Sequence, residues 1–165
     1  PNTPGSIVIL DADGTELSSP ISQNCNPCPR FPNWSPDGNK IAYTCDSILG
    51  HPKNELCVVN ADGTNNTRLT SPNISGGCEE SFPDWSPDGS KIIYDCNGGP
   101  TWSINADGSG QSRVGVGSRP GWSPDGAGIV FRKGSTEIWL MNADGSNAQM
   151  LNTGGTLNGG ARWGP

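Results

Sequence analysis

The stretch Phe31-Pro-Asn-Trp-Ser-Pro-Asp-Gly38 recurs twice in this chain, as Phe82-Pro-Asp-Trp-Ser-Pro-Asp-Gly89 and Arg119-Pro-Gly-Trp-Ser-Pro-Asp-Gly126. A fourth copy begins at Ala161-Arg-Trp163 and breaks off before its turn. A period of roughly 40 residues is typical of repeat architectures, in which one small unit buries its apolar face only when neighbours stack on it. The repeated stretch therefore predicts a fold built from similar stacked units.

Each repeat predicts four short strands. The Pro-x-Trp stretch forms the first, and the Ser-Pro-Asp-Gly turn leads into a second, which is rich in β-branched and aromatic residues. The second strands are expected at 40–44, 91–95 and 128–132. Third strands that end in an Asn/Asp-Ala-Asp-Gly turn are expected at 6–11, 55–60, 101–105 and 138–142, and short polar fourth strands at 67–70, 113–114 and 149–151. Runs of this composition between Gly and Pro are typical of strands.

Four antiparallel strands repeated about an axis form a β-propeller. We therefore predict an all-β fold, a small propeller of four blades in a single domain over residues 1–165. Three repeats span about 31–70, 82–115 and 119–151, and the fourth blade combines 161–165 with 6–19. This last blade, shared by the N- and C-terminal segments, is short of one strand because the second-strand pattern occurs only three times.

Composition narrows the range of partners. The chain has 24 Gly and 15 Pro, which suits many turns, and a net charge of -6. Its 10 Lys and Arg are scattered, whereas nucleic-acid binding needs clustered cations, so we expect no nucleic-acid partner. No apolar run approaches the roughly 20 residues that span a bilayer, so no membrane span is expected.

Six cysteines beside a single histidine favour disulfides over zinc and indicate an extracellular, oxidising compartment. Aligning the repeats places Cys28 and Cys45 at positions equivalent to Cys78 and Cys96. The predicted pairs are Cys28–Cys45, Cys78–Cys96 and Cys25–Cys57, although six cysteines allow about fifteen connectivities. Three glycosylation sequons, which suit the same compartment, begin at Asn33, Asn65 and Asn73.

The repeat resembles the TolB-like (WD40-like) β-propeller repeat, which also occurs in the propellers of prolyl-oligopeptidase relatives. The residues that carry the resemblance are Trp-Ser-Pro-Asp-Gly, an aromatic-ended strand and then Asn-Ala-Asp-Gly, and they extend over essentially the whole chain. The resemblance implies a fold and a tendency to bind partners, but no particular activity. Such propellers usually have six to eight blades, more than this chain supplies.

The Asp-Gly pairs fit hairpin turns, in which Asp caps the backbone and Gly adopts positive φ. A calcium site is the alternative, because both sets of turns fall at one end of the blades and gather hard oxygen ligands there. Asp11-Ala-Asp-Gly-Thr-Glu16 is the best candidate, with Asp11, Asp13 and Glu16 as ligands and Ca²⁺ as the candidate cofactor.

The tryptophans of the repeated stretch, Trp34, Trp85, Trp122 and Trp163, are predicted to pack between blades. Catalysis is not expected. The only histidine, His51, lies in a Gly-His-Pro stretch, and the chain has no Gly-x-Ser-x-Gly nucleophile motif.

The strand deficit leads to a functional expectation. An incomplete blade leaves backbone groups that template strand addition, and a head-to-tail contact propagates unless its rotation closes a ring. We expect an extracellular structural propeller that forms filaments, in which a neighbouring subunit's strand completes the deficient blade and calcium stabilises the assembly. A monomeric module that binds a glycan or protein is the alternative, and a fragment of a longer propeller is a third.

Overall fold

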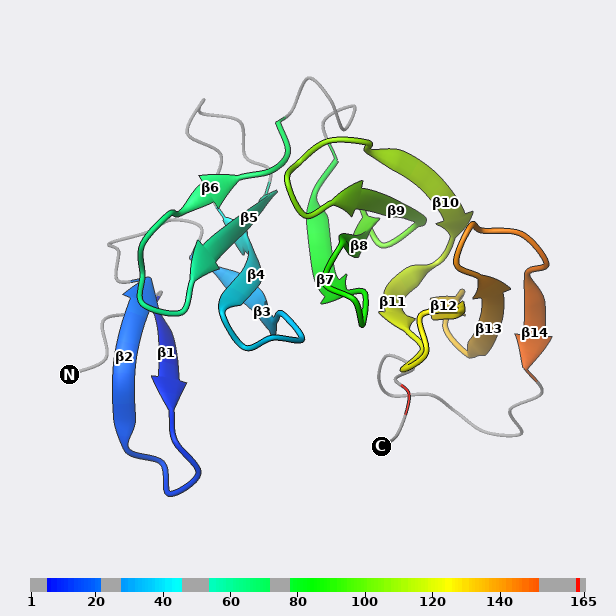
Figure 1. Cartoon of the computed structure of the whole chain (residues 1–165). Helices are drawn as coiled ribbons and strands as arrows, with labels where there is room; N and C mark the ends of the chain where they lie inside the picture. Colours follow the sequence, from blue (N-terminus) through cyan, green and yellow to red (C-terminus); the bar gives the residue numbers. More distant parts are fainter. Residues whose placement is uncertain (1–5, 22–27, 46–53, 72–77, 152–162, 164–165) are drawn as a thin grey trace.

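The structure is a computed structural model that describes residues 6–21, 28–45, 54–71, 78–151 and 163. These residues form 14 strands in four antiparallel sheets and no helix, as the sequence predicts (Figure 1). Within them, no segment has the helical length and hydropathy that a membrane span requires.

The first sheet has two strands and the other three have four each. We call the two-stranded sheet the half-blade; its strands are β1 (Ile7–Leu10) and β2 (Glu16–Ile21). Blade 1 contains β3 (Arg30–Trp34), β4 (Lys40–Cys45), β5 (Glu55–Asn60) and β6 (Thr67–Arg68).

Blades 2 and 3 repeat the same meander. Blade 2 contains β7 (Glu80–Trp85), β8 (Lys91–Cys96), β9 (Pro100–Asn105) and β10 (Ser112–Val116). Blade 3 contains β11 (Ser118–Trp122), β12 (Gly128–Lys133), β13 (Glu137–Asn142) and β14 (Gln149–Leu151).

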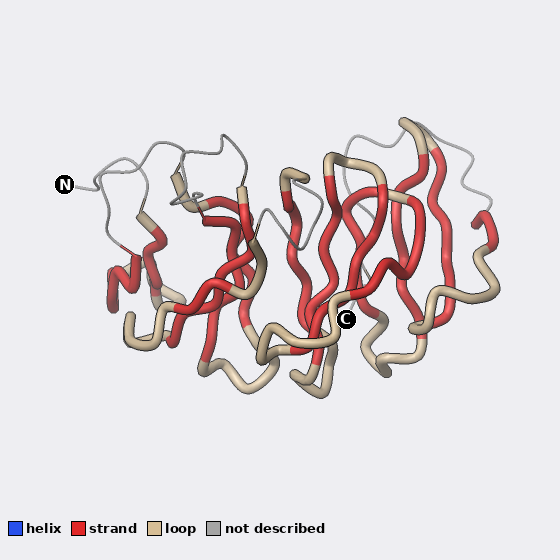
Figure 2. The backbone as a smooth tube through the Cα atoms, turned by 90° about the horizontal axis from the view of Figure 1, so that it is seen from above, coloured by secondary structure: helices blue, strands red, loops and turns tan. Residues whose placement is uncertain are grey.

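The sheets follow one another in an arc, with the half-blade at one end and blade 3 at the other (Figures 1 and 2). The strands β3, β7 and β11 line its concave side, and β6, β10 and β14 lie outside (Figure 1). Among the described residues β1 and β2 pair only with each other. Most of 161–165, the other part of the predicted fourth blade, lies outside the described residues.

Alternate residues of the central strands bury opposite faces of each blade, as a side-chain period of two requires. Ile41 and Tyr43 of β4 pack with Ile7 and Ile21 of the half-blade. Ala42, between them, belongs instead to the cluster shared with blade 2. A third cluster joins blade 2 to blade 3. The hydrophobic core thus consists of layers between successive sheets.

Each inner strand carries the same backbone irregularity. Phe31, Phe82 and Arg119, the residues before proline in the repeated stretch, have φ of 53°, 53° and 52°. The pairing register shifts at this point in each blade, which marks a β-bulge. The rings of Phe31 and Phe82 lie 4.1 Å apart, and the Arg119 guanidinium lies 4.8 Å from the Phe82 ring centre. The bulges therefore align a row of side chains from three blades.

Two disulfides are present among the described residues, Cys45–Cys57 and Cys78–Cys96. The second pair was predicted correctly. The predicted pairs Cys28–Cys45 and Cys25–Cys57 are wrong, because β4 and β5 are antiparallel neighbours that bring the Cα atoms of Cys45 and Cys57 to 5.8 Å. Aligning repeats misled the prediction because the partner of Cys45 lies on a third strand, where blade 2 has Trp102 instead of cysteine.

Candidate functional site on the inner strands

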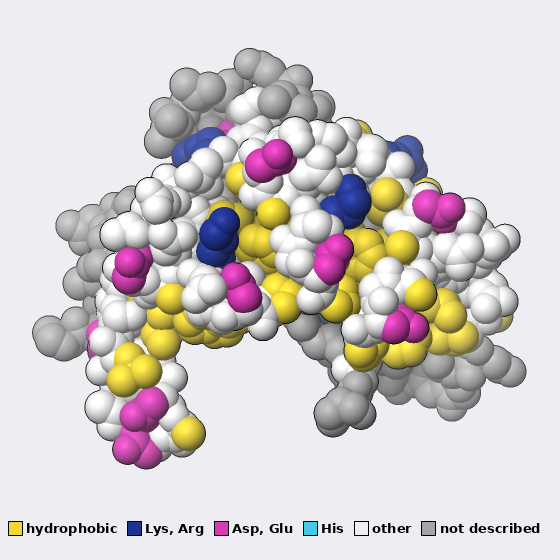
Figure 3. All heavy atoms as spheres, in the orientation of Figure 1, with side chains coloured by type: hydrophobic (Ala, Val, Ile, Leu, Met, Phe, Trp, Pro, Cys, Tyr) yellow, Lys and Arg dark blue, Asp and Glu magenta, His cyan; other side chains and the backbone are white. Residues whose placement is uncertain are grey.

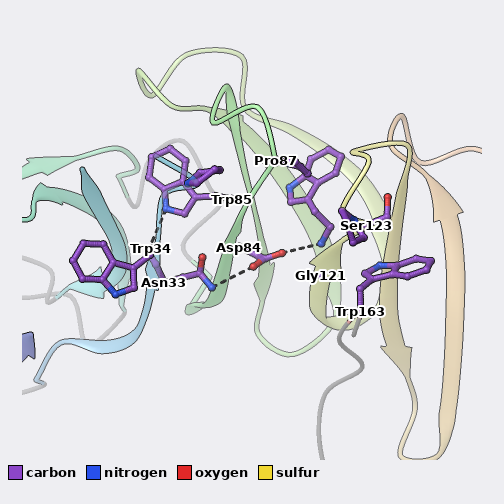
Figure 4. A pocket seen from close by; sticks show the side chains of 11 residues that line it. Asn33, Trp34, Asp84, Trp85, Pro87, Gly121, Ser123 and Trp163 are labelled. Atoms are coloured by element: carbon purple, nitrogen blue, oxygen red, sulfur yellow. Dashed lines mark hydrogen bonds between the residues drawn. The ribbon is translucent and has the colours of Figure 1, made fainter. Parts of the chain in front are cut away.

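The four tryptophans of the repeated stretch differ in exposure. Trp85 and Trp122 are 6% and 9% exposed and pack between blades, as predicted. Trp34 and Trp163 are 46% and 43% exposed, so the prediction that they too are buried between blades is wrong. All four tryptophans are among the residues that line one hollow, and Figure 4 labels Trp34, Trp85 and Trp163 there.

The difference follows from how each tryptophan packs on the sheet before it. The Trp85 indole nitrogen donates a hydrogen bond to the Asn33 carbonyl of blade 1 over 3.2 Å. Trp122 lines a pocket together with Ser86 and Pro87 of blade 2, and Trp163 lines one together with the equivalent Ser123 and Pro124 of blade 3. Trp34 follows the half-blade, which has no inner strand among the described residues, so its ring stays exposed.

The hollow between these rings is a cleft of about 280 Å³ with a polar centre. Asp84 on β7 accepts a hydrogen bond from the Asn33 side-chain amide over 3.2 Å and one from the Trp122 backbone N–H over 2.8 Å (Figure 4). One carboxylate thus connects all three blades. Two exposed indole rings around a carboxylate and an amide form a surface that suits a ligand with both apolar faces and hydroxyl or amide groups.

Buried polar side chains join the blades behind the cleft. Asp95 on β8 is fully buried and accepts the Arg119 backbone N–H over 2.8 Å, and burial raises its pKa. Thr70 donates to the buried Glu80 carboxylate over 2.5 Å and so connects blade 1 to blade 2. Because buried carboxylates need hydrogen-bond donors, these contacts hold the blades in place.

The aspartates of the Ser-Pro-Asp-Gly turns act within the turns. Asp37, Asp88 and Asp125 each accept the hydroxyl of the serine two residues earlier over 2.6 Å. Each also accepts the backbone N–H two residues later. The serine hydroxyl, followed by these other donors, lowers the pKa of Asp37 and Asp88 to about 2. Formation of the hairpin turn is therefore sufficient to explain these aspartates.

The candidate calcium ligands lie on the exposed loop and strand of the half-blade. Asp11 Oδ1 accepts the N–H groups of Asp13 and Thr15 over 3.0 and 3.1 Å, and Asp13 Oδ1 accepts that of Thr15 over 2.8 Å. The hydrogen bond with the Asp11 side chain, followed by those from Thr15, lowers the Asp13 pKa to about 2. Glu16 accepts the Ser19 hydroxyl over 2.6 Å. Within the described residues, no three His, Cys, Asp or Glu side chains are grouped as a metal site requires.

The sequons fall in different settings. The Asn33 amide is engaged with Asp84 in the cleft, whereas Asn65 is exposed in the loop before β6. Asn73 lies outside the described residues.

Sequence reasoning missed the connection through Asp84 and the row of side chains at the bulges. The only signal for Asp84 is that the residue before the repeated tryptophan varies, as Asn33, Asp84 and Gly121. The residue before the proline also varies, and positive φ at Phe or Arg is not expected from residue type.

The fold is similar to that of known proteins. No family model matches the chain. The Tol-Pal system protein TolB of Alcanivorax borkumensis is 34% identical over 89 residues, which are 54% of this chain and 19% of that protein. The structure of putative TolB from Agrobacterium tumefaciens matches with a TM-score of 0.73 and 22% identity, over 92% of this chain and 56% of that one. The chain therefore has a TolB-like, propeller-type fold and spans only part of these relatives.

Enzymes share this fold. An oligogalacturonate lyase in complex with manganese matches with a TM-score of 0.61 and 17% identity, over 85% of this chain and 40% of that one. At this identity the likeness concerns the fold alone. That the chain is not an enzyme thus stays a prediction. The two disulfides indicate an oxidising compartment.

Proposed function

We propose that this protein is an extracellular structural propeller that assembles head-to-tail into a filament, in which a neighbouring copy completes its incomplete blade. The exposure of Trp34 is the observation that carries the proposal. Trp34 is 46% exposed, whereas the equivalent Trp85 and Trp122, each with a full blade before it, are buried. Burying a large aromatic ring is worth roughly 1.5–3 kcal/mol, so the inner strand that this ring lacks would bind favourably.

The other end of the arc offers such a strand. Trp163 lines a hollow with Ser123 and Pro124 of blade 3, the equivalents of the Ser86 and Pro87 that line one with Trp122, which supports placing Trp163 at the first position of a next blade. A neighbour's Trp163 segment beside Trp34 would restore the packing that Trp85 has on blade 1. Because the two surfaces are different, the contact is heterologous and continues into a filament unless its rotation closes.

The half-blade is suited to such a contact. It projects from the end of the arc, where apolar and acidic side chains are exposed together (Figures 1 and 3). Among them, Leu10 and Leu17 are exposed on β1 and β2. We include calcium in the proposal, bound at Asp11, Asp13 and Glu16 and stabilising this end.

The cleft favours a second candidate function, a monomeric module that binds a glycan or a protein segment. Exposed indole rings can stack on the apolar faces of sugars, while the Asp84 carboxylate can accept hydrogen bonds from hydroxyl groups and the Asn33 amide can accept or donate them. In a filament the same rings are covered by the neighbour, so the two functions make opposite predictions for their accessibility.

Size-exclusion chromatography with light scattering and negative-stain microscopy tests the proposal. We expect the native protein to form extended polymers, and Trp34→Ala to shift it toward single chains of 17.2 kDa. Trp139→Ala is the matched control, because it removes an indole that packs against Phe131 within blade 3, away from the proposed contact.

Each outcome separates the two functions. A native protein that stays a discrete 17.2 kDa species at all concentrations contradicts assembly. In that case, quenching of tryptophan fluorescence by added oligosaccharides, lost in Trp34→Ala but kept in Trp139→Ala, would support the binding module.

A further inference from the structure

A recurrent contact joins each blade to the sheet before it. The turn between the third and fourth strands of a blade places a glycine against the fourth strand of the preceding sheet. A Cβ added to Gly63 of blade 1 would lie 3.2 Å from the Pro20 carbonyl oxygen of β2, and one added to Gly108 of blade 2 would lie 3.4 Å from that of Leu69, just after β6. A Cβ on Gly145 of blade 3 would clash with the Val114 carbonyl of β10. Three successive junctions thus use one contact.

Glycine is required there for two reasons. Gly63, Gly108 and Gly145 have φ of 85°, 88° and 87°, a conformation that residues with a Cβ adopt at a cost. In addition, the backbone of the preceding sheet leaves no room for a Cβ at Gly145 and only a tight fit at Gly63, whereas at Gly108 the approach is an ordinary van der Waals contact. These glycines lie against Pro20, Leu69 and Val114, which we call the acceptor residues. Each acceptor residue lies nine residues after the Asp or Asn that begins the turn of its own sheet.

One such turn and one acceptor position have no counterpart in the described part of the chain. Gly14, in the equivalent turn of the half-blade, has φ of 87° like the others, but nothing lies within 4 Å of a Cβ placed on it. Leu151, nine residues after Asn142, occupies the acceptor position at the end of β14 and is 37% exposed. The turn lies at one end of the arc and β14 at the other (Figure 1).

The exposure of Leu10 also indicates that the half-blade lacks a neighbour on the side of the Gly14 turn. Leu10, the last residue of β1, is equivalent to Val59, Ile104 and Met141, the residues before the turns of the three blades. Those three are buried, and Val59 and Met141 belong to the clusters that join their blades to the preceding sheet. Leu10 is 55% exposed, because the half-blade has no sheet before it in the described part of the chain.

We infer that the Gly14 turn of one copy packs on Leu151 of a second copy, with the geometry that joins successive blades within the chain. Leu10 then packs on the free face of the second copy's blade 3, where Leu140 lines a hollow with Trp163. The inference rests on the proposed self-assembly and specifies its contact. It also sets the direction, since the half-blade of one copy follows blade 3 of the next.

Two variants block opposite ends of this contact. Gly14→Asn adds a side chain where the turn would meet Leu151, and asparagine tolerates positive φ better than most residues. Leu151→Glu places a charge at the acceptor. The matched control is Gly134→Asn, because Gly134 also has positive φ and open space around it but lies in the β12–β13 turn, outside the proposed contact.

Light scattering and electron microscopy of the variants test the inference. We expect Gly14→Asn and Leu151→Glu each to lose polymers, while Gly134→Asn keeps them. Mixing the two blocked variants leaves one intact surface on each, so we expect discrete dimers, twice 17.2 kDa, that do not grow further. Circular dichroism and thermal unfolding establish that each variant is folded.

The failures can be told apart. If the unmodified protein never assembles, the proposed function fails. If it assembles and both folded variants still form normal polymers, self-assembly stands and the Gly14–Leu151 contact is overturned. A mixture of blocked variants that forms no dimers also overturns this pairing, because a contact joining these two surfaces requires one intact copy of each.

Discussion

At the residue scale, the same side chain serves two different purposes in this fold. Asp88 is exposed in a turn, where Ser86 and Ser90 surround it with donors and lower its pKa to about 2. Asp95 is buried between blades, and burial raises its pKa despite the Arg119 and Gly98 N–H groups. The surroundings of each carboxylate, rather than its residue type, set the sign of its effect on stability.

The turn aspartates predict an acid-sensitive fold. Because the folded-state pKa of Asp88 is about 2 against an ordinary value of 3.8, its contribution is fully present above about pH 4 and is lost as the pH falls toward 2. We expect Asp88→Asn to have a lower free energy of unfolding at pH 7 and a shallower loss between pH 4 and 2. Urea unfolding across this range checks the prediction, with Glu79→Gln as a control that removes one charge outside the turns. Parallel pH profiles for Asp88→Asn and the unmodified protein would contradict it.

At the scale of elements, the inner strand β11 donates backbone N–H groups to side chains of the neighbouring blade. The bulge in β11 removes Arg119 from the regular ladder, and its N–H is accepted by Asp95 of β8. Trp122, at the other side of the bulge, donates its N–H to Asp84 of β7. Side chains of blade 2 thus accept backbone N–H groups of the inner strand of blade 3 that would otherwise need another acceptor.

Removing one of these acceptors should weaken the junction between blades 2 and 3. We expect Asp95→Ala to lower the free energy of unfolding by about 1–3 kcal/mol, because the Arg119 N–H is left buried without its acceptor. Asp95→Asn, which keeps one acceptor oxygen, is the matched variant and should lose less. Denaturant unfolding measures both. Equal stability of Asp95→Ala and the unmodified protein would show that the Arg119 N–H finds another partner.

At the scale of the whole molecule, apolar side chains are exposed at both ends of the described arc, Leu10 on the half-blade and Leu151 on blade 3. Among the described residues, no sheet precedes Leu10 and the Gly14 turn, only the two-stranded half-blade precedes Trp34, and no sheet follows Leu151. Within the chain, the positions equivalent to Trp34 and Leu10 are buried in blades 2 and 3, at Trp85 and Trp122 and at Ile104 and Met141. Repeat proteins stack through nearest-neighbour contacts, so the contact that joins two blades can also join two molecules.

Calcium provides a test of how the ends are stabilised. If Asp11, Asp13 and Glu16 bind Ca²⁺ in the assembled protein, removing the ion leaves repelling carboxylates near the contact. We expect EDTA to shorten the polymers and added Ca²⁺ to restore them, with no response in Asp13→Asn. Light scattering and elemental analysis measure both effects. Polymers unchanged by EDTA and free of bound metal would remove calcium from the proposal.

Much of the architecture could be predicted from local patterns. The β-branched and aromatic residues in Lys40-Ile-Ala-Tyr-Thr44 and its copies predict strands, and the structure has β4, β8 and β12 there. The Asp-Gly turns likewise follow from the conformational freedom of glycine and the capping oxygen of aspartate. Both signals depend on residues close in sequence, so they survive without knowledge of the rest of the fold.

The site depends on contacts that the sequence does not reveal. Trp34 and Trp85 occupy identical motifs, yet one is exposed and the other buried, because only Trp85 has a complete blade before it. Asp84 forms hydrogen bonds with Asn33 and Trp122, which lie 51 and 38 positions away in the sequence. Cys45 forms its disulfide with Cys57 on the neighbouring strand, a pairing that the alignment of repeats did not indicate.

The sequence by itself determined the repeating four-stranded unit, its turns and the all-β fold, because periodicity and turn chemistry act within each repeat. Only the tertiary structure decided which copies of the motif bury their tryptophan and pair their polar groups, because burial and hydrogen bonding at each position depend on the sheet that lies beside it. The three complete repeats are therefore alike in sequence and in fold, but only those with a full blade before them bury the tryptophan that defines the repeat.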